Sequence, residues 1–100
     1  GRSVAMALGE KLTNNNLNVI VIGGDGGIYG EGLNHLITAA RGNINLKVFV
    51  SNNFLYSLTT GQTSPTTPFG AHTKSTPNGN INLPPHTTVS RKMIERWLNG

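Results

Sequence analysis

A single aspartate stands in a run of glycines directly after an apolar stretch. The segment is VIVIGGDGGIYGEG, residues 19–32, and Asp25 is the one aspartate among 100 residues. The turn after a buried strand is where open α/β sheets bind ligands, because backbone N–H groups converge there. Glycines let the backbone approach a phosphate closely, but a carboxylate would repel it. A Mg²⁺ ion between the two groups resolves this conflict, because it binds hard oxygen atoms from both.

A second set of oxygen donors follows the next apolar run. Asn52 and Asn53 come after the stretch 46–50, and 25 residues separate them from the GDG triplet. Adjacent strands lie about 4.8 Å apart, and parallel strands end at the same edge of a sheet. An Asn–Asn pair alone is more often a turn or a cap. Together with the glycine turn at this spacing, the pair predicts a divalent-cation site.

Other glycine-rich and metal sites fit the sequence less well. No G-x-G-x-x-G pattern is present, and no glycine precedes a lysine as a Walker A loop requires. One aspartate is too few for an EF-hand loop. The chain has no cysteine, which excludes disulfides, thiolate zinc sites and iron–sulfur ligation by these residues. His35, His72 and His86 have no metal-ligand spacing, so we interpret them as structural or solvated.

Hydrophobic periodicity predicts the elements that position these residues. Apolar spacing indicates helices over residues 3–12 and 31–41, the second ended by a Gly-Asn pair. Continuous β-branched or apolar runs at 19–22 and 46–50 are typical of buried strands of a parallel sheet. Strand, helix and strand at these lengths predict a βαβ unit whose crossover is right-handed. The fold class is therefore α/β.

Residues 57–85 are rich in Thr, Ser, Gly, Pro and Asn. Composition alone indicates a long loop or linker. A loop near 30 residues is unusual inside a compact domain, where most connections have about 4 to 6, and such loops tend to be functional or disordered.

The last residues, 86–100, predict a helix that docks through one apolar face. That face carries Val89, Met93, Trp97 and Leu98. The same stretch holds Arg91, Lys92 and Arg96 against Glu95, which gives it a net charge of +2, half of the chain's net charge of +4. A basic helix can bind nucleic acid, with a steep dependence on salt. We interpret the basic residues as a solvent-exposed helix face, because they are not interspersed with aromatic residues that could stack on bases, and no nucleic-acid recognition motif accompanies them. We expect no nucleic-acid partner.

The combination of GDG, 25 residues and NN resembles the diphosphate and metal motif of thiamine-diphosphate enzymes. The closer similarity is to the β subunit, the thiamine-binding chain, of 2-oxoacid:ferredoxin oxidoreductases. It extends from residue 1 to about residue 81, and TTGQTSPTTP is its most specific part. The segments that carry it are GDGGIYGEGLNHLITAARGNI, VSNNFLYSLTTGQTSPTTPFG and TKSTPNGNI.

The resemblance implies roles for individual residues. Asp25 and Asn53 would supply side-chain oxygens to Mg²⁺, and Leu55 its backbone carbonyl. The amides of three glycines would hold the diphosphate, and four residues of the following segment would close over the cofactor. The glycines are Gly24, Gly26 and Gly27, and the covering residues are Tyr56, Thr59, Gly61 and Gln62. On this view the Thr-rich stretch is an ordered active-site loop and not a linker.

The resemblance also implies an activity. Thiamine diphosphate and Mg²⁺ would support oxidative decarboxylation of a 2-oxoacid to an acyl-coenzyme A, with electrons passing through iron–sulfur clusters to ferredoxin. An α subunit would be the partner, and the glutamate that activates the cofactor usually lies there. Glu10, Glu31 and Glu95 match no such motif. The catalytic residues of this chain are therefore unknown, and we expect it to anchor the cofactor.

The expected fold is part of the doubly wound, parallel thiamine-diphosphate-binding fold, with a long loop and a C-terminal helix. Residues 1–85 would belong to this domain and 86–100 would form a divergent helical tail. Two strands are fewer than a full sheet needs, so we expect a fragment that is inactive alone and has exposed sheet edges. Without a leader or a long apolar run, we expect a cytoplasmic protein and no membrane partner.

The alternative hypothesis is a non-catalytic phosphate- or nucleotide-binding α/β module that shares the glycine turn. The two hypotheses differ in whether ligand binding requires a metal ion.

Overall fold

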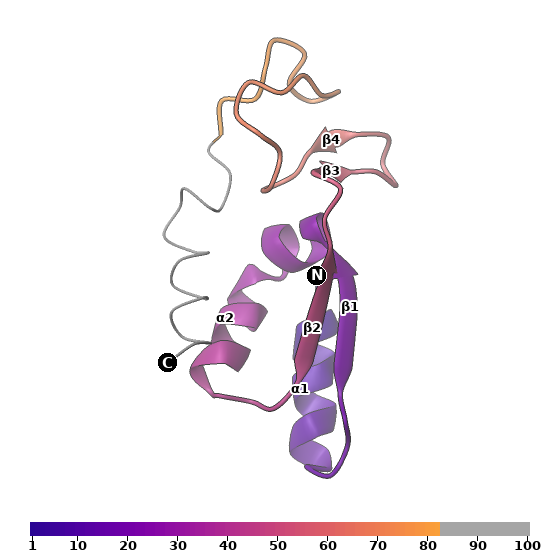
Figure 1. The fold of residues 1–100 in the computed structure, drawn as a ribbon, viewed down its shortest axis with the longest axis vertical. Helices are drawn as coiled ribbons and strands as arrows, with labels where there is room; N and C mark the ends of the chain where they lie inside the picture. The colour runs from indigo at the N-terminus through magenta and orange to yellow at the C-terminus, as the bar shows by residue number, and fades with distance from the viewer. Residues whose placement is uncertain (83–100) are drawn as a thin grey trace.

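The computed structural model describes residues 1–82 (Figure 1). The predicted tail helix and the predicted boundary between residues 85 and 86 lie outside this range. No helix within it is both long and apolar enough to cross a lipid bilayer. The elements are α1 (Ser3–Thr13), β1 (Ile20–Gly24), the π-helix η1 (Gly26–Glu31), α2 (Leu33–Arg41), β2 (Lys47–Ser51), β3 (Leu55–Tyr56) and β4 (Gln62–Thr63).

Strands β1 and β2 pair in parallel, with η1 and α2 as the connection between them. Their register runs from Ile20 opposite Lys47 to Gly24 opposite Ser51. The predicted βαβ unit is confirmed, and both strands are shifted by one or two residues from the predicted bounds. Because Gly24 and Ser51 are partners, Asp25 and Asn52 leave the sheet at the same edge.

One face of this small sheet carries the core. The buried apolar side chains come from α1, β1, η1 and α2 and are Val4, Ala7, Val21, Ile28, Leu36 and Ala39. Val48 and Val50 of β2 pack against this cluster. On the other face Ile20, Ile22 and Phe49 are 60%, 76% and 59% exposed. We expected a sheet covered on both faces, but residues 1–82 place α1 and α2 against one face only.

The glycine-rich stretch after β1 differs from the turn that we predicted. It forms the six-residue π-helix η1, which leads through Gly32 into α2. A π-helix is a wide coil that is rare and frequent at functional sites. Here the coil brings Ile28 into the core, where its side chain is 1% exposed and packs against Gly23. A Cβ on Gly23 would lie 2.9 Å from Ile28 Cδ1, so this close approach requires glycine.

Strands β3 and β4 form a short antiparallel hairpin beyond the carboxyl edge of the main sheet (Figure 1). Leu55 pairs with Thr63, and Tyr56 pairs with Gln62. The turn between them uses left-handed backbone, with φ of 79° at Thr60 and 102° at Gly61. Glycine adopts this conformation without strain, whereas threonine does so at a cost. The hairpin returns the chain toward Asp25.

Lys11 has an ammonium group that stabilises the connection from α1 to β1. The residue is only 5% exposed, and its Nζ donates to the carbonyl oxygens of Asn15 (2.7 Å) and Leu17 (2.6 Å). We expect Lys11→Met to lower the free energy of unfolding by about 1 to 2 kcal/mol, because two charge-assisted hydrogen bonds are lost. Chemical denaturation measures this change. Lys47→Met, at an exposed lysine, is the control and should have little effect.

Candidate functional site

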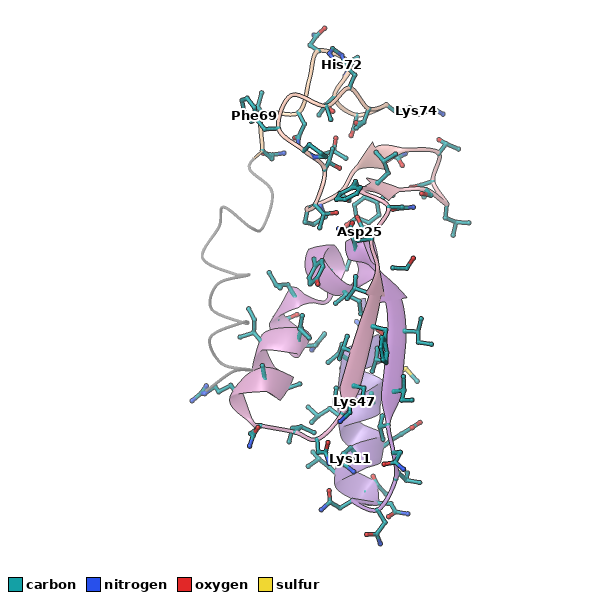
Figure 2. The ribbon with its side chains drawn as sticks, viewed as in Figure 1. Lys11, Asp25, Lys47, Phe69, His72 and Lys74 are labelled. Carbon is teal, nitrogen blue, oxygen red and sulfur yellow. The ribbon has the colours of Figure 1, made fainter. Side chains whose placement is uncertain are left out.

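The Asp25 side chain is buried where the main sheet meets the β3–β4 segment (Figure 2). It follows β1 directly and is 2% exposed. Its Oδ2 accepts hydrogen bonds from Ser64 Oγ (2.5 Å) and Thr66 Oγ1 (2.8 Å). Every hydrogen bond that residues 1–82 donate to this carboxylate ends on Oδ2. Oδ1 is therefore the oxygen that remains for another ligand.

The two asparagines after β2 have different surroundings. Asn52 Oδ1 lies 2.7 Å from Thr66 Oγ1, so the same hydroxyl reaches both Asn52 and Asp25. Asn53 Oδ1 accepts the Leu55 N–H at 3.2 Å, and Asn53 Nδ2 donates to Ser57 Oγ. Thr66 thus connects Asn52 with Asp25. Asn53, the residue expected from the sequence to bind the metal, makes its hydrogen bonds to Leu55 and Ser57 of the turn that follows it.

The three glycines that were expected to hold a diphosphate are not equivalent. A Cβ on Gly27 would meet no atom within 4 Å, and one on Gly24 would have only Ser51 O, at 3.9 Å. At Gly26 a Cβ would lie 2.3 Å from the Tyr56 ring. Gly24 and Gly27 therefore leave open space in front of the backbone. At Gly26 the missing side chain makes room for Tyr56.

Tyr56 joins the hairpin to η1. Its hydroxyl donates to the carbonyl oxygen of Gly26 at 3.3 Å, and its ring packs where side chains at Gly26 and Gly30 would otherwise lie. Thr59 and Gly61 lie in the turn of the same hairpin, and Gln62 is the first residue of β4. Thr59 Oγ1 donates to Gln62 Oε1 at 2.6 Å, and the Gly61 N–H donates to the Tyr56 carbonyl at 2.8 Å.

Comparison with known proteins identifies the family. The family model described as "Thiamine pyrophosphate enzyme, C-terminal TPP binding domain" matches residues 1–93. The chain belongs to this family. Its α/β thiamine-diphosphate-binding fold, expected from the sequence, is confirmed.

Several similar proteins belong to the group that the sequence resembles, the 2-oxoacid:ferredoxin oxidoreductases. The 2-oxoacid:ferredoxin oxidoreductase subunit beta of Saccharolobus solfataricus is 51% identical over 82 residues, which are 82% of this chain and 27% of the relative. The 2-oxoglutarate synthase subunit KorB of Archaeoglobus fulgidus is 51% identical over 84 residues, 84% of this chain and 32% of the relative. The chain therefore spans about a third or less of the length of these relatives.

A solved structure agrees with this assignment. The 2-oxoglutarate:ferredoxin oxidoreductase from Magnetococcus marinus, with 2-oxoglutarate, coenzyme A and succinyl-CoA bound, superimposes with a TM-score of 0.80 at 36% identity. The match covers 83% of this chain and 28% of that one. The similarity to β subunits of 2-oxoacid:ferredoxin oxidoreductases is thus confirmed in sequence, and the fold matches that of an oxidoreductase of this kind.

The donor set suits a thiamine pyrophosphate enzyme that holds its diphosphate through a hard cation. Residues 1–82 contain no cluster of three or more His, Asp or Glu side chains that could hold a metal ion without help from a ligand. They offer one buried carboxylate, nearby amide and hydroxyl oxygens, and the open backbone at Gly24 and Gly27. Mg²⁺ is commonly bound by one or two protein groups together with substrate phosphates. The residues present fit this arrangement.

The sequence did not predict that Ser64 and Thr66 contact Asp25. Both lie in TTGQTSPTTP, the segment that carried the family resemblance most specifically, but no role was assigned to them. They are 39 and 41 residues from Asp25 along the chain. The composition of the segment indicated only a loop, so the contact depends on how the hairpin folds back.

The Tyr56 phenol gives this site a dependence on pH. Burial, then the carboxylates of Glu31 and Asp25, raise the pKa of Tyr56 above its ordinary value of 10.0. The folded state therefore disfavours ionisation, and its stability decreases as the pH rises from 10 through the folded-state pKa. Tyr29 and Tyr56 are the two tyrosines of the chain. We expect Tyr56→Phe to remove from an ultraviolet titration of the folded protein one phenol that ionises above pH 10.

Proposed function

We propose that this chain is the part of a 2-oxoacid:ferredoxin oxidoreductase β subunit that anchors thiamine diphosphate through Mg²⁺. The observation that carries the proposal is 51% identity over 82 residues to such a subunit, in a chain whose one aspartate is buried at the carboxyl edge of a parallel sheet. Ligands of open α/β folds bind at this edge.

Within this proposal each residue has a defined task. Asp25 binds Mg²⁺ through its carboxylate, with Asn53 and the Leu55 carbonyl as the further protein ligands. The N–H groups of Gly24, Gly26 and Gly27 bind the diphosphate. The cofactor is covered by four residues of the β3–β4 hairpin, which are Tyr56, Thr59, Gly61 and Gln62. The bound cofactor supplies the chemistry that cleaves the bond next to the 2-oxo group.

The proposed overall reaction is oxidative decarboxylation of a 2-oxoacid with coenzyme A, with transfer of electrons to ferredoxin. It requires an α subunit and iron–sulfur clusters that residues 1–100 do not ligate through cysteine, since they contain none. 2-Oxoglutarate is the first substrate to test, because the printed names of similar proteins include it. The cytoplasmic location expected from the sequence remains a prediction.

Calorimetry on the whole natural protein that contains this chain, with its partner subunits, tests the proposal. We expect thiamine diphosphate to bind when Mg²⁺ is present and to bind far more weakly when the metal is chelated. Equal binding with and without Mg²⁺ would contradict the proposed anchoring. Binding of ATP or NAD in place of thiamine diphosphate would instead favour the non-catalytic nucleotide-binding module.

A further inference from the structure

Two hydroxyl groups hold one oxygen of the Asp25 carboxylate. Ser64 Oγ and Thr66 Oγ1 both donate to Oδ2, at 2.5 Å and 2.8 Å. Ser64 is 4% exposed and Asp25 is 2% exposed, so the first of these hydrogen bonds is shielded from water. Hydrogen bonds to a charged acceptor are roughly twice as strong as neutral ones. The pair therefore fixes the direction in which the carboxylate points.

The Thr66 hydroxyl lies between the ends of the two parallel strands. Its oxygen is 2.8 Å from Asp25 Oδ2 and 2.7 Å from Asn52 Oδ1. The Asn52 atom is an oxygen, since it also accepts the Phe54 N–H at 3.1 Å. A threonine hydroxyl has one proton and can donate to only one of these acceptors at a time. Thr66 Oγ1, Asp25 Oδ2 and Asn52 Oδ1 thus lie close together. The Thr66 hydroxyl supplies one proton to the other two oxygens, which are both acceptors.

The segment that presents these hydroxyls is itself held by buried polar contacts. The Ser64 N–H donates to Thr67 Oγ1 at 2.8 Å, and Thr67 Oγ1 donates to the Phe54 carbonyl. Asn80, which is 1% exposed, donates from Nδ2 to the Thr67 carbonyl at 3.0 Å. Ser64 and Thr66 therefore have a scaffold independent of Asp25, and removal of one hydroxyl need not unfold the segment.

We propose that Ser64 and Thr66 are positioning residues that hold the Asp25 carboxylate by Oδ2 and leave Oδ1 to face the Mg²⁺–diphosphate group. The inference rests on the proposed function, and it concerns two residues outside the expected ligand set. Groups that orient a metal ligand commonly change metal affinity by about 10- to 100-fold when they are removed.

The test measures the Mg²⁺ concentration that gives half-maximal binding of thiamine diphosphate to the whole natural protein. We expect Ser64→Ala and Thr66→Val to raise this concentration by about 10- to 100-fold. Thr66→Ser, which keeps the hydroxyl, should stay within about threefold of the wild type, because the hydrogen bond to Oδ2 is preserved. Thr73→Val is the matched control. It removes a hydroxyl of the same loop that bonds only to Thr63, Ser75 and Thr76 among the described side chains.

Thermal melting of each variant without metal or cofactor separates positioning from stability. The proposal expects nearly unchanged melting for Thr66→Val together with the raised Mg²⁺ requirement. Wild-type Mg²⁺ dependence in both Ser64→Ala and Thr66→Val would overturn the positioning role and leave the proposed function intact. Loss of the folded state in these variants would also overturn it, because the hydroxyls would then stabilise the fold. If the wild type itself bound no thiamine diphosphate, the proposed function would fail first and this inference with it.

Discussion

Asp25→Ala is expected to weaken Mg²⁺-dependent binding of thiamine diphosphate by more than about 100-fold, because changes in groups that merely orient a metal ligand already cost about 10- to 100-fold. Asp25 is the one aspartate of the chain and the buried carboxylate at the edge where β1 and β2 end. No other acidic group of residues 1–82 is buried, so none can replace it. Calorimetry of thiamine diphosphate at several Mg²⁺ concentrations measures the loss.

Glu31→Gln is the control for this experiment. Glu31 is an exposed acidic residue at the end of the same π-helix, so the variant changes the net charge equally without removing the proposed ligand. We expect it to bind thiamine diphosphate like the wild type. Equal losses in the two variants would mean that general electrostatics, and not coordination by Asp25, governs binding.

The second large effect is expected from substitutions at neighbouring glycines. In Gly26→Ala the new Cβ would lie 2.3 Å from Tyr56 Cε1 and 2.6 Å from Cδ1. The ring must leave its place on η1, and the hydrogen bond from its hydroxyl to the Gly26 carbonyl is lost with it. Overpacking of this kind costs about 1 to 3 kcal/mol. Denaturation of the variant should show this loss of stability, and the displaced hairpin should also weaken cofactor binding.

Gly27→Ala is predicted to separate stability from binding. Its Cβ would meet no atom within 4 Å, so the folded state should be as stable as the wild type or gain up to about 1 kcal/mol from the lower entropy of the unfolded chain. Binding of thiamine diphosphate should nevertheless fall, because the methyl group occupies space that the diphosphate needs. A Gly27→Ala protein with unchanged affinity would remove Gly27 from the proposed diphosphate site.

Local sequence patterns predicted the central part of the fold well. Two apolar runs correspond to the paired strands of the structure. They are the β-branched run at 19–22, which overlaps β1, and the run at 46–50, which overlaps β2. The length of each run and the distance between the two runs along the chain suit a parallel pair. Leu36 of the second predicted helix is buried in the core, and Leu33 and Ile37 of the same helix pack against it. The position of Asp25 at the sheet edge followed from the same pattern.

The remaining features depend on contacts between distant parts of the chain. The π-helix η1 accommodates Tyr56, which lies 30 residues after Gly26, so the glycine run alone indicated only a turn. Likewise, the bonds from Ser64 and Thr66 to Asp25 exist because the β3–β4 hairpin reverses the chain. An Asn–Asn pair also cannot reveal which of its members contacts Thr66, and in the structure it is Asn52.

A crystal structure of the whole natural protein with thiamine diphosphate and Mn²⁺ in place of Mg²⁺ tests the central claim most directly, because anomalous scattering locates the ion. We expect one ion bonded both to a diphosphate oxygen and to an Asp25 carboxylate oxygen, near the distance of about 2.1 Å that Mg²⁺ ligands adopt. An ion bound to the diphosphate but not to Asp25 would contradict it.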